Sequence, residues 1–292
     1  MKIAIYGRNA NDNVSQHIRL LFQKLNHYKA DLLIYEPFYN FIKKKIEVVG
    51  NIKTFNSHSD LAGNADYLLS IGGDGTILET LTFVRDSQIP VLGINTGRLG
   101  FLANVAKEEI NTAIESLMNK KFSIEQRTLL SVTNPKDLFG DVNYGLNELT
   151  ILKKDSSAMI TIHTYIDGNF LNSYFADGLI VATPTGSTAY SLSCGGPLIM
   201  PGSQNFVITP IAPHNLNVRP LVISDNNTIT LKVEGRSPNY LLSLDSRNVV
   251  IDSSVELTIQ KEKFSIHLIQ LENQNFYTTI RNKLLWGLDR RV

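Results

Sequence analysis

Short apolar runs alternate with helically spaced apolar residues over about the first 120 positions, and this rhythm constrains the fold more than any other feature of the chain. The apolar runs fall at residues 3–6, 32–35, 67–71 and 90–94. Helically spaced stripes follow at residues 14–25, 77–84 and 110–118. Strands that alternate with helices predict a Rossmann-like α/β domain, in which helices cover both faces of a parallel sheet. Ligands of such sheets bind beyond the carboxyl ends of the strands.

From about Phe122 the apolar spacing changes to period two, which is typical of strands with one buried face. Strands are predicted around residues 130–132, 159–162, 229–233 and 255–259. Asp167-Gly168 between two apolar pairs predicts a tight hairpin turn. The tail, 276–288, has helical spacing. We therefore expect an α/β domain over residues 1–122, to which 273–292 return as a helix, and a β-rich domain, mainly an antiparallel sandwich, over 123–272.

The composition bounds the class of protein. The chain has 292 residues, of which 43% are hydrophobic and 19% charged, as expected of a globular protein. Its 28 basic and 27 acidic residues provide no electrostatic field for nucleic acid or a membrane. Cys194 is the only cysteine, which excludes an internal disulfide and favours a reducing compartment. Neither a signal peptide nor a membrane span is recognisable, so a cytoplasmic protein is expected.

The run Gly72-Gly73-Asp74-Gly75-Thr76 follows a predicted strand and precedes a predicted helix. Glycines allow a ligand to approach the backbone closely, and the amides suit phosphate. A carboxylate among them suits proton or metal chemistry beside a transferring phosphoryl group. The alternative is a tight turn in which Asp74 only caps its helix. No Lys-Ser/Thr pair follows the glycines, so the run is not a Walker A loop.

Two further segments carry polar groups that suit a nucleotide. Residues 95–102 follow a predicted strand; there Arg98 is a candidate cation for phosphate, and Phe101 could cover a base or sugar, or simply pack in the core. Asn147-Glu148 lies in a strand-like stretch and suits a ribose diol or an adenine edge. Neighbouring strand residues point to opposite faces, so the two would share a ligand only at a bulge or a strand end. Without that context they are ordinary solvated residues.

The segment 177–197 breaks from a strand into a loop that carries five hydroxyl residues within eight positions, 183–190, and then into a short helix. Neutral donors and acceptors suit an uncharged heterocycle and its sugar, and Tyr190 offers a stacking face. A purely structural Ser/Thr turn is the alternative. The six histidines are scattered without metal-ligand spacing, so no protein metal site is predicted.

These four segments, in this order, resemble the NAD kinase family, the ATP-NAD or polyphosphate-NAD kinases. Pro213-His214-Asn215-Leu216 and Arg219-Pro220 also resemble family sequence. The match extends over most of the chain. A single glycine loop would carry little weight, because phosphofructokinases and diacylglycerol kinases have similar loops. The resemblance implies a phosphofructokinase-type α/β fold and transfer of the ATP γ-phosphoryl group to the 2′-hydroxyl of the adenosine ribose of NAD.

The resemblance also implies roles for residues of this chain. Asp74 would be the general base, and a divalent ion, expected to be Mg²⁺, would arrive with the phosphoryl donor. The donor phosphates would meet Gly72, Gly73, Gly75, Thr76 and Arg98. NAD would be bound by Gly75, Phe101, Asn147, Glu148, Asp177, Thr185, Thr188, Ala189, Tyr190, Ser191, Ser193, Ala212 and Asp245. The family further implies a homodimer or homotetramer, assembled through the β-rich domain, with Asp177 often acting across the subunit interface.

Two other functions are consistent with parts of the pattern. A lipid or sugar kinase would share the glycine loop, but it would need a lipid surface or a cationic clamp, and neither is evident in the sequence. A non-catalytic NAD sensor would use the same pocket and tolerate loss of Asp74. After Asp245 the chain has Ser246-Arg247, where many relatives have a glycine or glutamine nearby, which affects the expected nicotinamide contacts. The sequence does not decide between ATP and polyphosphate, or whether NADH is accepted.

Overall fold

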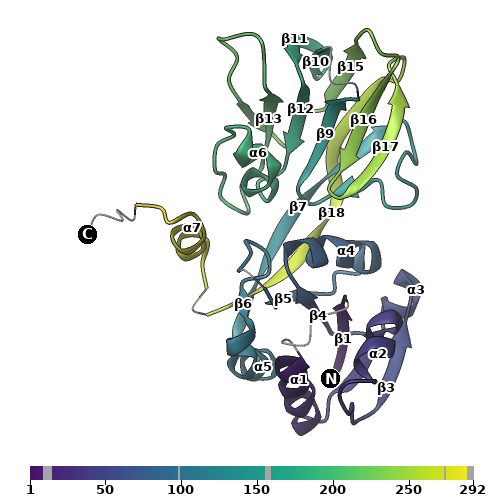
Figure 1. The fold of residues 1–292 in the computed structure, drawn as a ribbon, viewed down its shortest axis with the longest axis vertical. Helices are drawn as coiled ribbons and strands as arrows, with labels where there is room; N and C mark the ends of the chain where they lie inside the picture. The colour runs from purple at the N-terminus through teal and green to yellow at the C-terminus, as the bar shows by residue number, and fades with distance from the viewer. Residues whose placement is uncertain (9–14, 98, 155–158, 273, 288–292) are drawn as a thin grey trace. The chain divides into compact units, whose positions relative to one another are not determined.

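A computed structural model describes residues 1–8, 15–97, 99–154, 159–272 and 274–287. The chain forms two compact units (Figure 1). Unit 1 comprises residues 1–126 and 266–292, and unit 2 comprises residues 127–265. Two long strands, β7 (Phe122–Asn134) and β18 (Leu257–Leu271), belong to both units along the chain. The change in periodicity predicted limits at 122/123 and 272/273, whereas the compact units meet at 126/127 and 265/266.

Unit 1 contains five parallel strands in the order β3-β2-β1-β4-β5. Their bounds are β1 Lys2–Gly7, β2 Asp31–Tyr35, β3 Ile52–Phe55, β4 Tyr67–Gly72 and β5 Val91–Asn95. The short β6 (Val105–Ala106) and the end of β18 also pair with β5 in parallel. The order reverses between β1 and β4, where Gly7 is in register with Ile71. The carboxyl ends of these two strands are therefore the expected ligand-binding point of this sheet.

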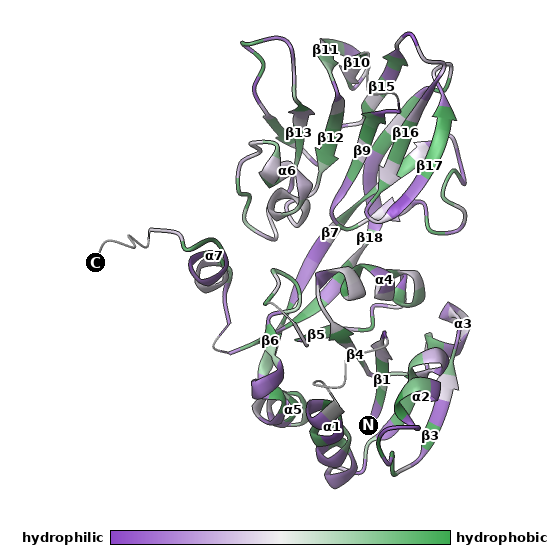
Figure 2. Cartoon of the chain, in the orientation of Figure 1, coloured by the Kyte–Doolittle hydropathy of each residue, from purple (hydrophilic) through white to green (hydrophobic). Residues whose placement is uncertain are grey.

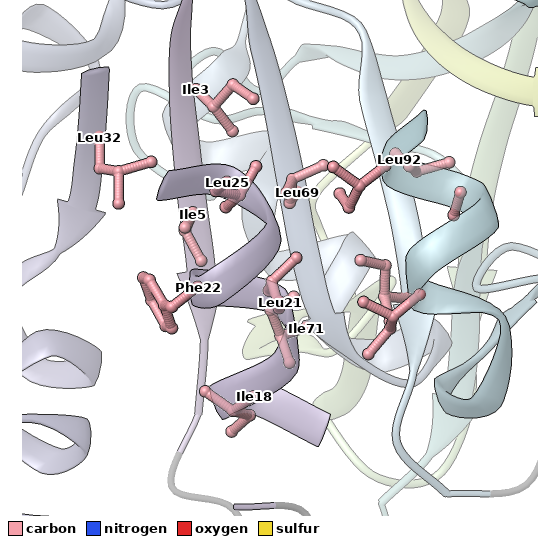
Figure 3. Packing of buried hydrophobic residues seen from close by; sticks show 14 of the residues in the cluster. Ile3, Ile5, Ile18, Leu21, Phe22, Leu25, Leu32, Leu69, Ile71 and Leu92 are labelled. Carbon is pink, nitrogen blue, oxygen red and sulfur yellow. The ribbon is translucent and has the colours of Figure 1, made fainter. Parts of the chain in front are cut away.

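Helices cover both faces of this sheet, as predicted. Helix α1 (Ser15–His27) packs beside α5 (Ile110–Met118) on one face, and both carry hydrophilic and hydrophobic residues along their coils (Figure 2). In Figure 3 the side chains of Leu21 and Leu25 from α1 lie among those of Ile3, Ile5 and Leu69 from the strands. Burying such side chains stabilises the unit by roughly 1.5–3 kcal/mol for each one.

Helix α4 (Asp74–Val84) lies against β4 and β5 on the other face. Gly93 of β5 makes this contact possible, because a Cβ at that position would stand 2.5 Å from Cδ1 of Ile77. Short helices α2 (Glu36–Ile42), α3 (His58–Leu61) and the 3₁₀ turn η2 (Lys107–Glu109) complete the connections. The predicted terminal helix is present as α7 (Phe276–Leu284) and belongs to unit 1.

Unit 2 consists mainly of antiparallel strands, as predicted. One sheet has the order β14-β13-β12-β9-β16-β17, and the strands β11-β10-β15-β18 form the other with β7 and β8 (Tyr144–Gly145). The remaining bounds are β9 Glu148–Lys153, β10 Ile160–Ile166, β11 Asn169–Ala176, β12 Gly178–Ala182, β13 Asn205–Ile211, β14 Leu221–Ser224, β15 Ile229–Glu234, β16 Asn239–Leu244 and β17 Arg247–Asp252. The predicted hairpin is confirmed, because Asp167 and Gly168 join β10 to β11 with φ of +49° and +78°.

The core of unit 2 draws side chains from both sheets, which makes it a sandwich. Leu149, Val181 and Leu242 of one sheet share a buried cluster with Ile162 and Leu231 of the other. Strand β12 is buried along its whole length. Its alternate residues, Ile180 and Ala182, face a second cluster that includes Ile199, so the segment after β12 returns to cover the outer face of this sheet.

Candidate functional site

Asp74 stands where β4 gives way to α4, at the point where the strand order reverses. Gly73 is the N-cap of α4, and no side chain caps the helix. The carboxylate instead accepts three hydrogen bonds from another loop. Phe101 N–H donates to Oδ2 at 2.8 Å, while Leu102 and Ala103 donate to Oδ1 at 3.0 and 2.8 Å. Asp74 therefore does not cap its own helix, and its carboxylate binds the amides of residues 101–103 instead.

Among the residues that the structure describes, this geometry leaves the Asp74 carboxylate with one free acceptor position. A carboxylate has about four lone-pair positions, two on each oxygen. The amides occupy both on Oδ1 and one on Oδ2. Gly100 lies against the same group, because a Cβ there would stand 1.8 Å from Oδ1. The loop therefore holds the carboxylate in one orientation, with Oδ2 able to accept one more proton donor.

The glycines around Asp74 differ in what surrounds them. A Cβ at Gly72 would stand 2.1 Å from Thr76 Oγ1, so this glycine is needed for the turn to close, and Thr76 is buried against it. At Gly73 and Gly75, such a Cβ would have no atom within 4 Å from any described residue beyond the adjoining backbone. The first N–H groups of an α-helix lack intrahelical acceptors and favour anions. Open space beside Gly73 and Gly75 thus suits a phosphate.

Asn95 joins two described parts of its loop, Gly97 and Ala103, a role that the sequence did not reveal. Asn95 is buried, accepts the N–H of Gly97 at 2.7 Å and donates to the carbonyl of Ala103 at 3.3 Å. Phe101 is half-buried, and its ring lies 5.9 Å from the ammonium of Lys283. Arg98 lies outside the described residues.

In unit 2, Asp245 makes the same kind of contact as Asp74. It lies in the turn between β16 and β17 with φ of +52°. Its Oδ2 accepts the N–H of Leu146 at 2.8 Å, and Oδ1 accepts those of Asn147 at 2.8 Å and Glu148 at 3.1 Å. The pKa of the Asp245 carboxyl is raised, because the effect of burial exceeds the opposing effects of the three amides and the nearby Arg247 guanidinium.

Arg247, which departs from the family pattern, donates hydrogen bonds to the carbonyls of Val142 and Tyr144. Its guanidinium therefore fixes the segment that leads into β8 and lies close enough to favour the ionised form of Asp245. Both contacts lie within the protein. At this position the side chain supports the loop that carries Asn147.

Asn147 and Glu148 lie at the start of β9, which is the strand-end placement that would let both contact one ligand. The carboxyl group of Glu148 accepts the N–H of Tyr190, and its Oε2 is buried with no hydrogen-bond partner among the described residues. Burial, and then the charge of Asp245, raises the pKa of Glu148 to about 8. Glu148 is therefore largely protonated at neutral pH and can donate a hydrogen bond as well as accept one.

The hydroxyl-rich loop, residues 183–193, contains the 3₁₀ turn η3 (Gly186–Thr188) and helix α6 (Tyr190–Ser193). Several of its hydroxyls bind the protein itself. Thr183 donates to the carbonyl of Leu146 at 2.5 Å, Ser187 accepts the N–H of Ile199 at 3.0 Å, and Ser191 bonds with Thr209 at 2.9 Å. These hydroxyls therefore help to fold the loop, which is the structural alternative to a role in ligand binding.

The predicted ligand residues in this loop differ in exposure. Thr185 is buried and accepts a hydrogen bond from Arg127 Nη1 at 3.3 Å, a partner that the sequence did not reveal. Ser191 is fully buried, Thr188 and Ala189 are half-buried, and Ser193 is exposed. The Tyr190 ring is 41% exposed and so presents a face to solvent. Roles for these residues in binding remain predictions.

The two remaining predicted residues, Asp177 and Ala212, lie at the opposite end of β12. Asp177 precedes β12 and pairs with Lys153, whose Nζ lies 2.6 Å from Oδ1. Ala212 follows β13, is exposed and has φ of +44°. The N–H of Tyr190 donates to the carboxyl group of Glu148, and burial, Cys194 and the charge of Asp177 raise the pKa of the Tyr190 phenol. Hydrogen bonds therefore join Asn147, Glu148, Tyr190 and Asp245 at one end of β9, whereas Asp177 and Ala212 lie at the other end of β12.

Comparisons with known proteins identify the family of this chain. Residues 40–122 match the ATP-NAD kinase N-terminal domain, and residues 146–271 match the ATP-NAD kinase C-terminal domain. NAD kinases of Cytophaga hutchinsonii and Flavobacterium psychrophilum are 48% and 49% identical over 292 and 293 residues, covering 100% of this chain and of each relative.

Two solved structures have the same fold. Yeast NADH kinase in complex with NADH has a TM-score of 0.86 and 25% identity, over 100% of this chain and 90% of the yeast chain. An NAD kinase of Archaeoglobus fulgidus in complex with ATP has a TM-score of 0.74 and 26% identity, over 98% and 99% of the two chains. Both family domains and full-length relatives thus agree: the chain belongs to the NAD kinase family of enzymes.

Proposed function

We propose that the protein transfers the γ-phosphoryl group of ATP to the 2′-hydroxyl of the adenosine ribose of NAD, giving NADP and ADP. The ribose oxygen forms a bond to the γ-phosphorus while the bond to the β-γ bridging oxygen breaks. The proton of the hydroxyl passes to Oδ2 of Asp74. The observation that carries this proposal is the Asp74 carboxylate, oriented by three amides with one acceptor position open.

General-base catalysis by a positioned carboxylate typically accelerates such a step about 10²–10⁴-fold. A ribose hydroxyl is a weak nucleophile, and a base within hydrogen-bond reach removes its proton as the attack develops. The amides of residues 101–103 hold the carboxylate still, so no orientation has to be selected at the moment of transfer.

The donor phosphates would bind at Gly73 and Gly75, with Gly72 and Thr76 shaping the turn. Open space at the first two, together with the amides of the first turn of α4, supports this assignment. A divalent ion, expected to be Mg²⁺, would neutralise charge on the donor phosphates. The described residues contain no cluster of three or more His, Cys, Asp or Glu side chains suited to a metal. Mg²⁺ is commonly bound through one or two carboxylates together with the substrate's phosphates.

Binding of NAD is assigned to Phe101 and to the unit 2 residues predicted for it. Oε2 of Glu148 is buried and has no hydrogen-bond partner in the described part of the chain, which supports a polar ligand atom there, and the exposure of Tyr190 supports stacking. A structural relative binds NADH and another binds ATP, which supports both nucleotides as ligands.

A homo-oligomer, dimer or tetramer, formed through unit 2 is part of the proposal. β14 is an edge strand of its sheet, and Leu221 and Val222 on it are 37% and 44% exposed. Exposed apolar edges favour pairing with another chain. In the part of the chain that the structure describes, no helix has the length and apolar character to cross a membrane.

Incubation with ATP, Mg²⁺ and NAD, followed by an NADP-specific assay, tests the reaction. We expect NADP in proportion to ADP. Absence of NADP, with label from γ-³²P-ATP appearing instead on a lipid or sugar, would establish the alternative kinase. Binding of NAD with no labelled product of any kind would establish a sensor.

A further inference from the structure

The segment that follows β18 contacts the loop around Asp74 at two places. Gln274 Nε2 donates to the carbonyl of Asn104 at 3.0 Å, just before α7 begins. Near the other end of that helix, Lys283 Nζ donates to the carbonyl of Leu99. All of these residues belong to unit 1. The C-terminal segment thus reaches both sides of residues 100–103.

Lys283 also lies over an aromatic ring of this loop. Its ammonium is 5.9 Å from the ring centroid of Phe101, within the range of a cation–π interaction. The apolar side chains of α7, Phe276, Ile280 and Leu284, are only half-buried, and no residue of the helix is fully buried, so polar contacts such as those of Lys283 contribute to its position. Lys283 is exposed. Holding its long side chain in the hydrogen bond and the ring contact therefore costs conformational entropy.

The two groups that Lys283 contacts lead directly to Asp74. Leu99 precedes Gly100, whose N–H donates to the carbonyl of Ala103 at 3.1 Å and closes the turn. The N–H of Phe101 donates to Oδ2 of Asp74, the oxygen with the free acceptor position. A movement of residues 99–101 would therefore move the one amide that orients this oxygen.

We propose that Lys283 is a positioning residue for Asp74, and that α7 thereby fixes the 99–103 loop for catalysis. The inference rests on the proposed base role of Asp74. An exposed cation–π contact contributes only about 0.5–1 kcal/mol to stability. Misplacing a reacting group by about 1 Å can lower a rate about 10²-fold. The role should therefore be visible in turnover and not in the stability of the fold.

Three variants of α7 test the proposal. Lys283→Met keeps the aliphatic stem and removes the charge and the donor; Lys283→Arg keeps both; Arg281→Met removes a neighbouring cation whose described contact is to Thr278. We expect Lys283→Met to lower kcat for NADP formation roughly tenfold, with KM for ATP and NAD within twofold and Tm unchanged. Lys283→Arg should recover most of the rate, and Arg281→Met should retain it.

A raised KM for ATP with unchanged kcat in Lys283→Met would show that the ammonium binds donor phosphate, and would overturn the positioning role. So would an unchanged kcat, or an equal loss in Arg281→Met.

A double-mutant cycle separates this inference from the proposed function. If Lys283 acts through Asp74, Lys283→Met should have little further effect on the residual rate of Asp74→Asn, measured over long incubations with an NADP cycling assay. An equal fold-loss in both backgrounds would contradict the positioning role. Wild-type turnover by Asp74→Asn would instead refute the base assignment itself, whatever Lys283→Met does.

Discussion

Asp74 and Asp245 each accept hydrogen bonds from three consecutive backbone amides, those of residues 101–103 and 146–148. Charge-assisted bonds of this kind are short and strong, and they satisfy loop N–H groups that lack a strand partner. The same device thus appears once in each unit. In both cases a single side chain determines the path of a loop that carries predicted ligand residues, Phe101 in one and Asn147 and Glu148 in the other.

Gly100→Ala should disturb Asp74 more than any other small change in its loop. The new Cβ would stand 1.8 Å from Oδ1, so the carboxylate or the loop must move. We expect NADP formation to fall about 10²-fold, as for other misplacements of about 1 Å. Gly97→Ala is the matched control, because the nearest atom to its Cβ would be 3.9 Å away. Steady-state rates of the two variants decide the matter, and equal activities would show that the position of Asp74 is unimportant.

Glu148 should give the fold a pH dependence. Its pKa is about 8 in the folded protein, well above the ordinary value of 4.5. Between about pH 4.5 and pH 8, the Glu148 carboxyl is therefore ionised in the unfolded chain but still protonated in the folded one. Its contribution to stability is fully present below about pH 4.5 and is lost as the pH rises through 8. Glu148→Gln, which stays neutral, should remove that loss.

Urea unfolding of wild type and Glu148→Gln at pH 5 and at pH 8.5 measures this effect. We expect the wild type to lose more stability over this interval, by an amount on the order of a few kcal/mol, because each pKa unit corresponds to about 1.4 kcal/mol. Glu108→Gln, on an exposed turn, should follow the wild type. Parallel pH profiles of wild type and Glu148→Gln would show that Glu148 ionises normally in the fold.

At the scale of elements, the turn from β4 to α4 contains two glycines with different surroundings: Gly72 is packed against Thr76, and Gly75 borders open space. Gly72→Ala places a Cβ 2.1 Å from Thr76 Oγ1 and should cost about 1–3 kcal/mol of unfolding free energy. Gly75→Ala meets no atom within 4 Å and lies inside α4, where alanine is favoured over glycine by roughly 0.5–1 kcal/mol.

We therefore expect Gly75→Ala to be at least as stable as wild type and yet to have a several-fold higher KM for ATP, because its methyl group enters the space assigned to phosphate. Thermal unfolding together with ATP titration of both variants makes the comparison. A normal KM for ATP in Gly75→Ala would place the donor phosphates elsewhere.

Elements with a regular apolar pattern could be predicted, and those without one could not. The four predicted strands of unit 1 and the Asp167-Gly168 hairpin are present. Strand β3 was missed, because within Ile52–Phe55 only Phe55 is buried and no alternation appears. Local fragments of β7 and β18 were recognised, but not their lengths of 13 and 15 residues, because partly exposed polar stretches interrupt their apolar pattern.

At the scale of the whole molecule, the sequence could nominate candidate site residues but could not predict the contacts that hold them. Asp74 meets Phe101 across 27 positions, Asp245 meets Leu146 across 99, and Lys283 meets Leu99 across 184. No local pattern encodes such pairings, because backbone amides and carbonyls supply the partner groups. The hydroxyl-rich loop shows the converse: its composition suggested a ligand, while buried hydroxyls such as that of Ser191 also bind the protein itself.

The central claim, that Asp74 accepts the proton of the ribose hydroxyl, is tested most directly by NADP formation in Asp74→Asn at saturating ATP, Mg²⁺ and NAD. Asp86→Asn, a carboxylate 70% exposed in the same unit, is the control, and NAD titration reports whether the variant is folded. We predict that Asp74→Asn binds NAD within roughly tenfold of wild type and loses about 10²–10⁴-fold in kcat, while Asp86→Asn is unchanged. Turnover by Asp74→Asn near the wild-type rate would contradict the claim.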